Sequence, residues 1–227
     1  RKLLQQASGS GVKRFIYVSS VKAMGEGNPA GLPVEQMDET WPHTPQTPYG
    51  IAKAEAENLV LESPLAHKVV LRPVMVYGPG EKGNLPRMVQ AVKRGRFPPL
   101  PETGNKSSMI HVEDLVEYMI RAGLRPVADG KSYILSGTDA LSTRELYDSI
   151  REALGMSPVD WSIPFIALKI CAGMGSVLGF VFRRRMPLDI ETLSKLTGSA
   201  WYSPDLAMNE LDYTPQHSVR DWLGSRD

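Results

Sequence analysis

The 227-residue chain contains a single cysteine, Cys171. One thiol cannot form an intramolecular disulfide or a cysteine-rich metal site, and such sparse cysteine use agrees with a reducing compartment. The chain also lacks an excess of charge of one sign, because 26 Lys and Arg residues face 25 Asp and Glu residues, for a net charge of +1. We therefore expect a cytoplasmic protein that binds a small molecule and no nucleic acid.

Histidine is scarce as well, with four residues in the chain. Three of them, His43, His67 and His217, have no partner at the spacing of a metal site. The sequence therefore predicts no metal centre.

One apolar segment, residues 163–182, resembles a membrane span because three arginines follow it at 183–185. Lys169 interrupts the segment, Pro164 stands near its start, and several glycines lie within it. These features favour a buried or surface-docked helix over a span. Membrane association of this segment stays open, but it is not the favoured interpretation.

Three short apolar runs predict buried strands at residues 15–18, 68–71 and 133–135. Helical patterns lie between and after them, at residues 49–62, 85–94, 111–122 and 142–154. Strands that are separated by helices of this length pair in parallel, with helices on both faces of the sheet. The sequence therefore predicts a doubly wound α/β fold.

Three strands make a thin sheet for so much helix. The chain also begins inside an amphipathic helical pattern, without an initiator methionine or an apolar leader. We therefore expect that preceding sequence, with the first strands of a larger sheet, is absent.

The clearest chemical signal is the pair Tyr49 and Lys53, which lie four residues apart on a predicted helix and so share one face. An ammonium close to a phenol favours the phenolate, which can then exchange a proton with a substrate hydroxyl. A hydroxyl of Ser19 or Ser20, at the end of the first strand, could hold the substrate oxygen. This equipment suits hydride transfer at a carbinol carbon, although a surface contact between the two side chains would have the same spacing.

Five motifs place this pair in a wider pattern. They are RFIYVSS at 14–20 with Gly25, DE at 38–39, PQTPYGIAK at 45–53, LRPVMVYGPG at 71–80 and MIHVEDL at 109–115. In order and spacing they resemble the extended short-chain dehydrogenase/reductase family, in particular its nucleotide-sugar epimerases and dehydratases. The resemblance implies a Rossmann-like parallel sheet whose N-terminal strands are missing, joined to a smaller, mostly helical substrate-binding lobe.

The resemblance also implies roles for individual residues. Tyr49 would be the catalytic acid/base, Lys53 would bind the nicotinamide ribose, and Ser20 would orient the substrate. The cofactor, NAD or NADP, would also meet Ser19, Pro73 and Val76. The substrate-binding positions would be Ser20, Asn84, Leu85 and Lys106. For Asn84 a helix cap is an equal alternative, and His111 corresponds to a position with a structural role.

Two departures from the family pattern concern the substrate. Met75 stands where many sugar-nucleotide enzymes have Asn, and Ser107 stands where an arginine is expected, with Lys106 beside it as a substitute. The glycine-rich turn that cradles the pyrophosphate, and the acidic or basic residue that distinguishes NAD from NADP, are not in the chain. The leading hypothesis is an NAD(P)-dependent UDP-sugar 4-epimerase; the alternatives are a reductase of an apolar ketone, of hydroxysteroid or dihydroflavonol type, and an inactive fragment.

The same resemblance implies a division of the chain and an assembly. Residues 1–80 would be the C-terminal half of the NAD(P)-binding domain, and residues 81–227 mainly the substrate-binding lobe, with 109–136 returning to the sheet. Helices around residues 1–9 and 47–63 would form a homodimer.

Overall fold

Two small sheets form the centre of the molecule. The computed structural model describes residues 1–28, 33–81, 83–182 and 188–225. In the first sheet, β1 (Phe15–Val18), β2 (Lys68–Pro73) and β5 (Ser132–Leu135) are parallel and lie in the order β1-β2-β5. In the second, β4 (Ser107–His111) lies between β3 (Met75–Tyr77), which is parallel to it, and β6 (Ala140–Leu141), which is antiparallel.

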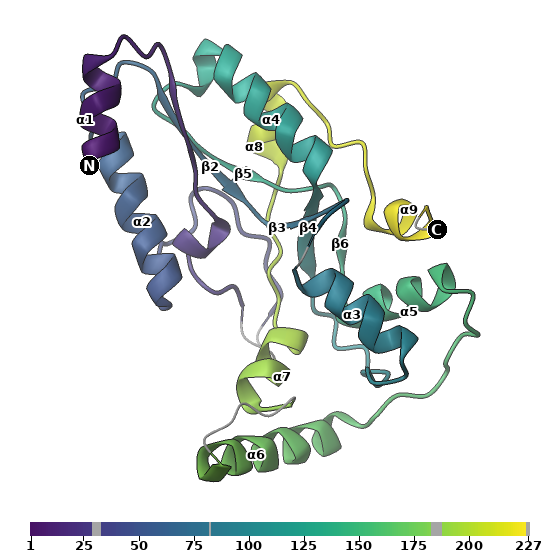
Figure 1. Ribbon diagram of the computed structural model, residues 1–227. Coiled ribbons are helices and arrows are strands. Elements are labelled where there is room, and N and C mark those ends of the chain that lie inside the picture. Colours follow the sequence, from purple (N-terminus) through teal and green to yellow (C-terminus); the bar gives the residue numbers. More distant parts are fainter. Residues whose placement is uncertain (29–32, 82, 183–187, 226–227) are drawn as a thin grey trace.

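Helices surround these sheets (Figure 1). They are α1 (Lys2–Gly9), α2 (Pro48–Leu61), α3 (Asn84–Lys93), α4 (Val112–Leu124), α5 (Thr143–Ala153), α6 (Phe165–Phe182), α7 (Ile190–Thr197), α8 (Asp205–Leu211), α9 (Val219–Gly224) and the short 3-10 turns η1 (Val21–Ala23) and η2 (Pro126–Ala128).

Helices cover both faces of the first sheet. Helix α2 packs against β2 on one face, and α4 and α8 contact β1, β2 and β5 on the other (Figure 1). The layers enclose a core around the fully buried strand residues Val69, Leu71 and Ile134. This arrangement confirms the predicted doubly wound parallel fold, and the three predicted strands form its first sheet.

The strands of the second sheet were missed by the sequence prediction. Each is short, and β4 begins with two serines whose hydrogen bonds lie far along the chain. Ser108 Oγ accepts from the backbone N–H of Tyr202, and the Ser108 N–H donates to the Ala200 carbonyl. A strand held by such distant partners has no local apolar pattern.

The helix predicted from residue 111 starts one residue later, at Val112. His111 is its N-cap, because its Nδ1 accepts from the Glu113 N–H at 3.3 Å. The next helix, α5, opens with a capping box: Ser142 Oγ accepts from the Glu145 N–H, and the Glu145 carboxylate accepts from the Ser142 N–H. Both helices therefore begin at polar side chains that satisfy their free N–H groups.

The apolar segment at residues 163–182 contains helix α6, which lies at the edge of the molecule and packs on α7 (Figure 1). The arginines at 183–185 lie outside the described residues. Among the described residues, no helix combines the length and the apolar character that crossing a bilayer requires.

Candidate functional site

Tyr49 and Lys53 lie on one face of α2, near the start of the helix. Thr47 caps this helix by accepting from the Gly50 N–H at 3.2 Å, and Pro48 occupies its first turn. The Tyr49 side chain is 56% exposed, and the Lys53 Nζ lies 5.8 Å from the centre of its ring. The structure therefore brings the predicted phenol and ammonium together at an accessible position.

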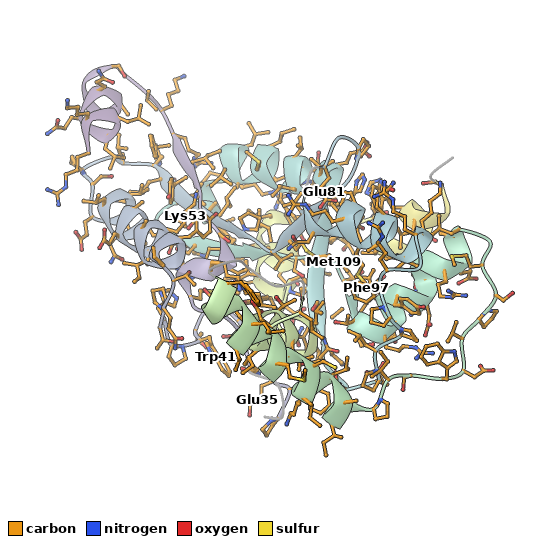
Figure 2. All side chains as sticks on the ribbon, turned by 60° about the horizontal axis from the view of Figure 1, so that its bottom comes forward. Glu35, Trp41, Lys53, Glu81, Phe97 and Met109 are labelled. Carbon is orange, nitrogen blue, oxygen red and sulfur yellow. The ribbon has the colours of Figure 1, made fainter. Side chains whose placement is uncertain are left out.

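Lys53 reaches from α2 to the end of β1 (Figure 2). Its Nζ donates to the carbonyl of Val18, the last residue of the strand, at 3.0 Å, and lies 5.1 Å from the centre of the Tyr17 ring. An ammonium has three N–H donors, and Val18 is the one hydrogen-bond acceptor that it contacts among the described residues. Lys53 is thus fixed at the carboxyl edge of a parallel sheet, where ligands of doubly wound folds bind.

The two candidate serines follow β1 directly but face different surroundings. Ser19 is buried, and its hydroxyl has no hydrogen-bond partner among the described residues. Ser20 is half-buried and caps η1, with its Oγ accepting from the Lys22 N–H at 3.3 Å. Ser19 therefore offers a free buried hydroxyl at the strand end, and Ser20 stands at the start of the turn beside it.

Helix α2 lies directly on this turn. A Cβ atom added at Gly50 would overlap the backbone carbonyl oxygen of Lys22. Because residue 50 has no side chain, the helix start can approach η1 closely, which brings the segments carrying Ser20 and Tyr49 into contact.

Behind this site, α2 is anchored to β2 by a buried ion pair that the sequence analysis missed. Arg72 donates to both carboxylate oxygens of Glu57, at distances from 2.7 to 3.1 Å. Burial, together with the Arg72 charge, lowers the pKa of the nearby His43. Glu57 lies one helical turn after Lys53, so its four-residue spacing from Lys53 could have indicated that it shares a face of α2 with Tyr49 and Lys53. Nothing in the sequence indicated that Arg72 on β2 is its partner.

The other predicted cofactor residues lie on neighbouring strands. Pro73 is buried at the end of β2, opposite Leu135. Val76 is half-buried in β3, in a separate small sheet, where it pairs with Ile110. No described contact joins Pro73 or Val76 to Lys53, so the structure places them near the strand ends without bringing the set together.

The predicted substrate residues are dispersed. Asn84 is exposed as the first residue of α3, whose N-cap is Gly83, so the cap alternative for Asn84 is wrong. Leu85 is 1% exposed and packs in a core with Tyr77, and its role as a substrate-binding position stays a prediction. The Lys106 ammonium lies over the Trp201 ring, 3.9 Å from its centre.

A cleft of about 560 Å³ lies where the C-terminal segment crosses the start of α4, and it is lined in part by His111, Glu113 and His217. Potential ligand atoms of these three residues lie within 4.8 Å of one another. The Nδ1 atom of His111 accepts from a backbone N–H, however, so the neutral ring carries its proton on Nε2. Burial lowers the pKa of His111, and the stacked His217 ring adds to this effect. We read the cluster as a structural contact.

Comparisons with known proteins identify the family of the chain. Residues 1–135 match the model of the NAD dependent epimerase/dehydratase family. A UDP-glucose 4-epimerase of Vibrio cholerae is 35% identical over 169 residues, which are 71% of this chain and 49% of that protein. A 2-alkyl-3-oxoalkanoate reductase of Stenotrophomonas maltophilia is 30% identical and covers 94% of this chain and 67% of its own length.

Among solved structures, the UDP-glucose 4-epimerase of Thermotoga maritima, determined with UDP-glucose, superposes with a TM-score of 0.68 at 22% identity. The match covers 98% of this chain and 64% of that structure, and it supports the fold. The chain thus spans between about half and two thirds of the length of these relatives.

Proposed function

Because the chain belongs to the NAD-dependent epimerase/dehydratase family, we propose that it forms the catalytic part of a UDP-sugar 4-epimerase, in which Tyr49 moves the proton. The observation that carries the proposal is the contact geometry at the start of α2. An exposed phenol, a lysine ammonium and a serine-bearing turn meet at the carboxyl edge of a parallel sheet.

The residues at this edge fit NAD, the cofactor of the family. The Ser19 hydroxyl is buried without a partner among the described residues, and Lys53 is held in place by one of its three N–H donors. Both would hold the ribose and nicotinamide side of the cofactor, together with the backbone around Pro73. When bound, NAD supplies the hydride acceptor and donor.

The protein residues then handle the proton and the position of the substrate. Tyr49 accepts the proton of the substrate hydroxyl when the carbon is oxidised and returns it when the carbon is reduced. Lys53, with its Nζ 5.8 Å from the ring centre, stabilises the negative charge that develops on the phenol oxygen. Ser20 donates a hydrogen bond to the same substrate oxygen, which fixes the reacting carbon.

The substrate class rests on fewer observations. The V. cholerae 4-epimerase has the higher identity of the two curated relatives described above. Asn84 is exposed at the start of α3, where a substrate could reach it. Lys106 carries the one positive charge beside Ser107, and its stacking on Trp201 holds the ammonium at a defined place for a diphosphate.

A second candidate is an NAD(P)H-dependent reductase of an apolar ketone. Its specific support is that similarity to the 2-alkyl-3-oxoalkanoate reductase extends over 94% of the chain, including the C-terminal half. Met75 is apolar where many sugar-nucleotide enzymes have the polar Asn. Ser107 is uncharged where such enzymes are expected to have a basic arginine. The same Tyr49, Lys53 and Ser20 would serve this reaction.

Tyr49→Phe in the full-length gene product tests the mechanism. We expect kcat to fall about 100-fold or more, because the variant has no acid/base, while NADH binding measured by calorimetry stays intact. The matched control is Tyr17→Phe, whose ring also lies near the Lys53 ammonium. Undiminished turnover of Tyr49→Phe would remove the proposal.

Product analysis separates the two substrate classes. A 4-epimerase converts a UDP-hexose without net consumption of cofactor, whereas a reductase consumes one NAD(P)H for each ketone reduced. Both assays are run on the same preparation, with UDP-glucose and with a 2-alkyl-3-oxoalkanoate as substrates.

The expected division at residue 80 and the homodimer remain proposals. Exposed apolar side chains on the expected dimer helices, Leu3 on α1 and Ile51 on α2, support an association through this face. Sedimentation of a Leu3→Glu/Ile51→Glu variant against the parent chain tests it, with a shift from dimer to monomer as the expected result.

A further inference from the structure

The outer face of helix α3 carries a basic hollow. The inner face of the helix, where Leu85 and Val92 are buried, packs in an apolar core beside α5 (Figure 1). On the opposite face lies a hollow of about 460 Å³, which we call the α3 hollow. Steps of three and four residues keep its helical positions on one side of α3. The residues that line it include Pro86, Arg87, Gln90, Ala91, Arg94 and Arg96.

The charge of this segment is of one sign. Residues 83–101 contain four basic side chains and no Asp or Glu, so they carry +4, whereas the whole chain carries +1. The acidic residues that flank the segment are Glu81, which lies beside Gly83 at one end of the hollow, and Glu102. The Glu102 carboxylate is engaged elsewhere, because it accepts from Ser142 Oγ at 2.6 Å. Among the described residues, no carboxylate lines the α3 hollow.

The arginines of the hollow differ from the other arginines that the structure describes. Those elsewhere pair with a carboxylate or donate to a backbone carbonyl, namely Arg14, Arg72, Arg121, Arg125, Arg144, Arg151 and Arg220. Apart from Arg1 at the chain start, the described arginines whose side chains make no such contact are Arg87, Arg94 and Arg96. Their guanidinium groups therefore present planar sets of N–H donors to the hollow, a geometry that fits phosphate oxygens.

Arg87 stands where the helix itself disfavours a cation. It lies at the end of the first turn of α3, and that turn contains no acidic side chain. The N-terminal end of a helix carries a partial positive charge, so a cation there is destabilising and an anion is stabilising. Lys93 and Arg94, at the other end, suit the helix dipole. The place of Arg87 has no such explanation, but it is the place from which an anion in the hollow would be bound.

From these observations we propose that the α3 hollow binds the linked phosphates of a soluble di- or triphosphate. Arg87 and Arg94 are seven residues apart, which is about 10 Å along a helix. An extended chain of linked phosphates therefore meets both guanidinium groups more readily than a single phosphate does. The volume of the hollow suits one small ligand.

The lining of the hollow argues against larger anionic partners. It contains no aromatic side chain on which a nucleic-acid base could stack. It also contains no apolar side chain larger than that of Pro86, so a bilayer would find no residue there that enters its headgroup boundary. A soluble ligand with several negative charges remains the best match to the three arginines.

This site is separate from the candidate catalytic edge. Tyr49, Lys53 and Lys106 do not line the α3 hollow, and neither does Asn84, although Asn84 begins the same helix. The proposal therefore does not rest on the proposed function and would stand for an epimerase or a reductase.

Titration calorimetry of the full-length gene product with inorganic tripolyphosphate tests the binding. Arg94→Gln should weaken it about tenfold or more, because charge-assisted hydrogen bonds are lost. Arg94→Lys keeps the charge but loses the planar fork, and should weaken binding about threefold or more. The matched control is Lys93→Gln, which removes the same charge from an exposed neighbouring position outside the hollow. At physiological salt its Kd should change less than about twofold.

Thermal unfolding gives a second measurement that does not depend on activity. Tripolyphosphate should raise the Tm of the parent protein but not that of Arg87→Gln/Arg94→Gln, because a ligand stabilises the folded state that binds it. Both side chains are exposed and make no ion pair with a described residue. The ligand-free double variant should therefore unfold no earlier than the parent, which shows that it is folded.

Four results would overturn the proposal. One is binding no tighter than millimolar to a parent protein that circular dichroism shows to be folded. Another is an equal loss in Lys93→Gln and Arg94→Gln, which would indicate attraction by overall charge. The third is a loss of tripolyphosphate binding in Lys106→Met, which would place the ligand in the expected substrate site. The fourth is binding to vesicles that contain phosphatidic acid without binding of tripolyphosphate, which would assign the α3 hollow to a lipid surface.

Discussion

Glu57 of α2 and Arg72 of β2 form an ion pair that is almost completely buried, with side chains 3% and 5% exposed and an Oε2–Nη2 distance of 2.7 Å. The pair joins the helix that carries Tyr49 and Lys53 to the central strand of the first sheet. Both Arg72 Nε and Nη2 point at the carboxylate, which satisfies each charge with direct hydrogen bonds.

Removing one member of this pair should therefore be costly. In Glu57→Ala the Arg72 guanidinium stays buried without its counter-charge, and we expect the free energy of unfolding to fall by about 3–5 kcal/mol. The double variant Glu57→Leu/Arg72→Met removes both charges and should recover most of that loss. Urea unfolding of the three proteins measures the effect, and a loss below about 1 kcal/mol in Glu57→Ala would contradict a desolvated pair.

Asp114 also joins distant parts of the chain, because it holds the C-terminal segment on α4. It is completely buried and accepts hydrogen bonds from the Tyr213 hydroxyl at 2.6 Å, the Gln216 N–H at 3.0 Å and the His217 N–H at 3.2 Å. Burial raises the pKa of this carboxyl, but the hydrogen bonds outweigh burial and the net shift is downward. The charged carboxylate therefore holds the C-terminal segment on α4.

The pH dependence of stability should reveal this contact. A carboxyl whose pKa is lower in the folded state stabilises the protein above its unfolded pKa of about 3.9, and this contribution is lost as the pH falls through the folded value. Asp114→Asn should thus be destabilised by about 1.5–3 kcal/mol near pH 7 and by less near pH 3, in urea unfolding at both pH values. A difference that does not depend on pH would contradict the assignment.

Gly50 allows the start of α2 to rest on the Lys22 carbonyl. Gly50→Ala should lower stability by about 1–3 kcal/mol, because the added methyl group overlaps backbone that cannot move freely. The matched control is Gly173→Ala in α6, where the Cβ atom meets nothing within 4 Å and the better helix propensity should add up to about 1 kcal/mol. Thermal unfolding compares them; equal changes in both variants would exclude the close approach.

The sequence predicted those parts of the fold that rest on local pattern. The runs at 68–71 and 133–135 are mostly buried between helices on both faces of the first sheet, whereas the run at 15–18, predicted as buried, is half-buried at the edge of that sheet; all three were recognised by their apolar residues. The Tyr49–Lys53 pair was recognised because four residues make about one helical turn. Their catalytic roles stay predictions, because the structure shows only that the side chains meet.

Contacts between distant segments could not be predicted in this way. The partner of Asp114 lies 99 residues away at Tyr213, and the start of β4 is held by residues 199–202. A charged residue such as Arg72 within a strand looks like a surface position until its partner on α2 is known. Leu85 was assigned to the substrate site by family position, and the core that its side chain shares with Tyr77 could not be predicted from local pattern.

Lys53 provides the last test, because its two expected roles predict two separate effects. Lys53→Met keeps the length of the side chain but loses the hydrogen bond to the Val18 carbonyl and the charge near Tyr49. Lys53→Met also removes the hydrogen bond that the ammonium would donate to the ribose of NADH. Because a hydrogen bond to a charged group contributes about 1.5–3 kcal/mol, the Kd for NADH should rise about tenfold or more. A lower kcat should accompany this rise even at saturating cofactor, because the phenolate loses its counter-charge.

Lys22→Met is the matched control, since Lys22 also lies beside this site but pairs with Glu26 on the surface. Calorimetry gives the Kd, and steady-state rates at saturating NAD give kcat. If Lys53→Met weakened cofactor binding but left kcat unchanged, Lys53 would bind the ribose without assisting Tyr49. If the Kd and kcat of Lys53→Met both matched those of Lys22→Met, the cofactor site would have to lie elsewhere. Among the described residues, no other ammonium joins the end of β1 to the exposed phenol.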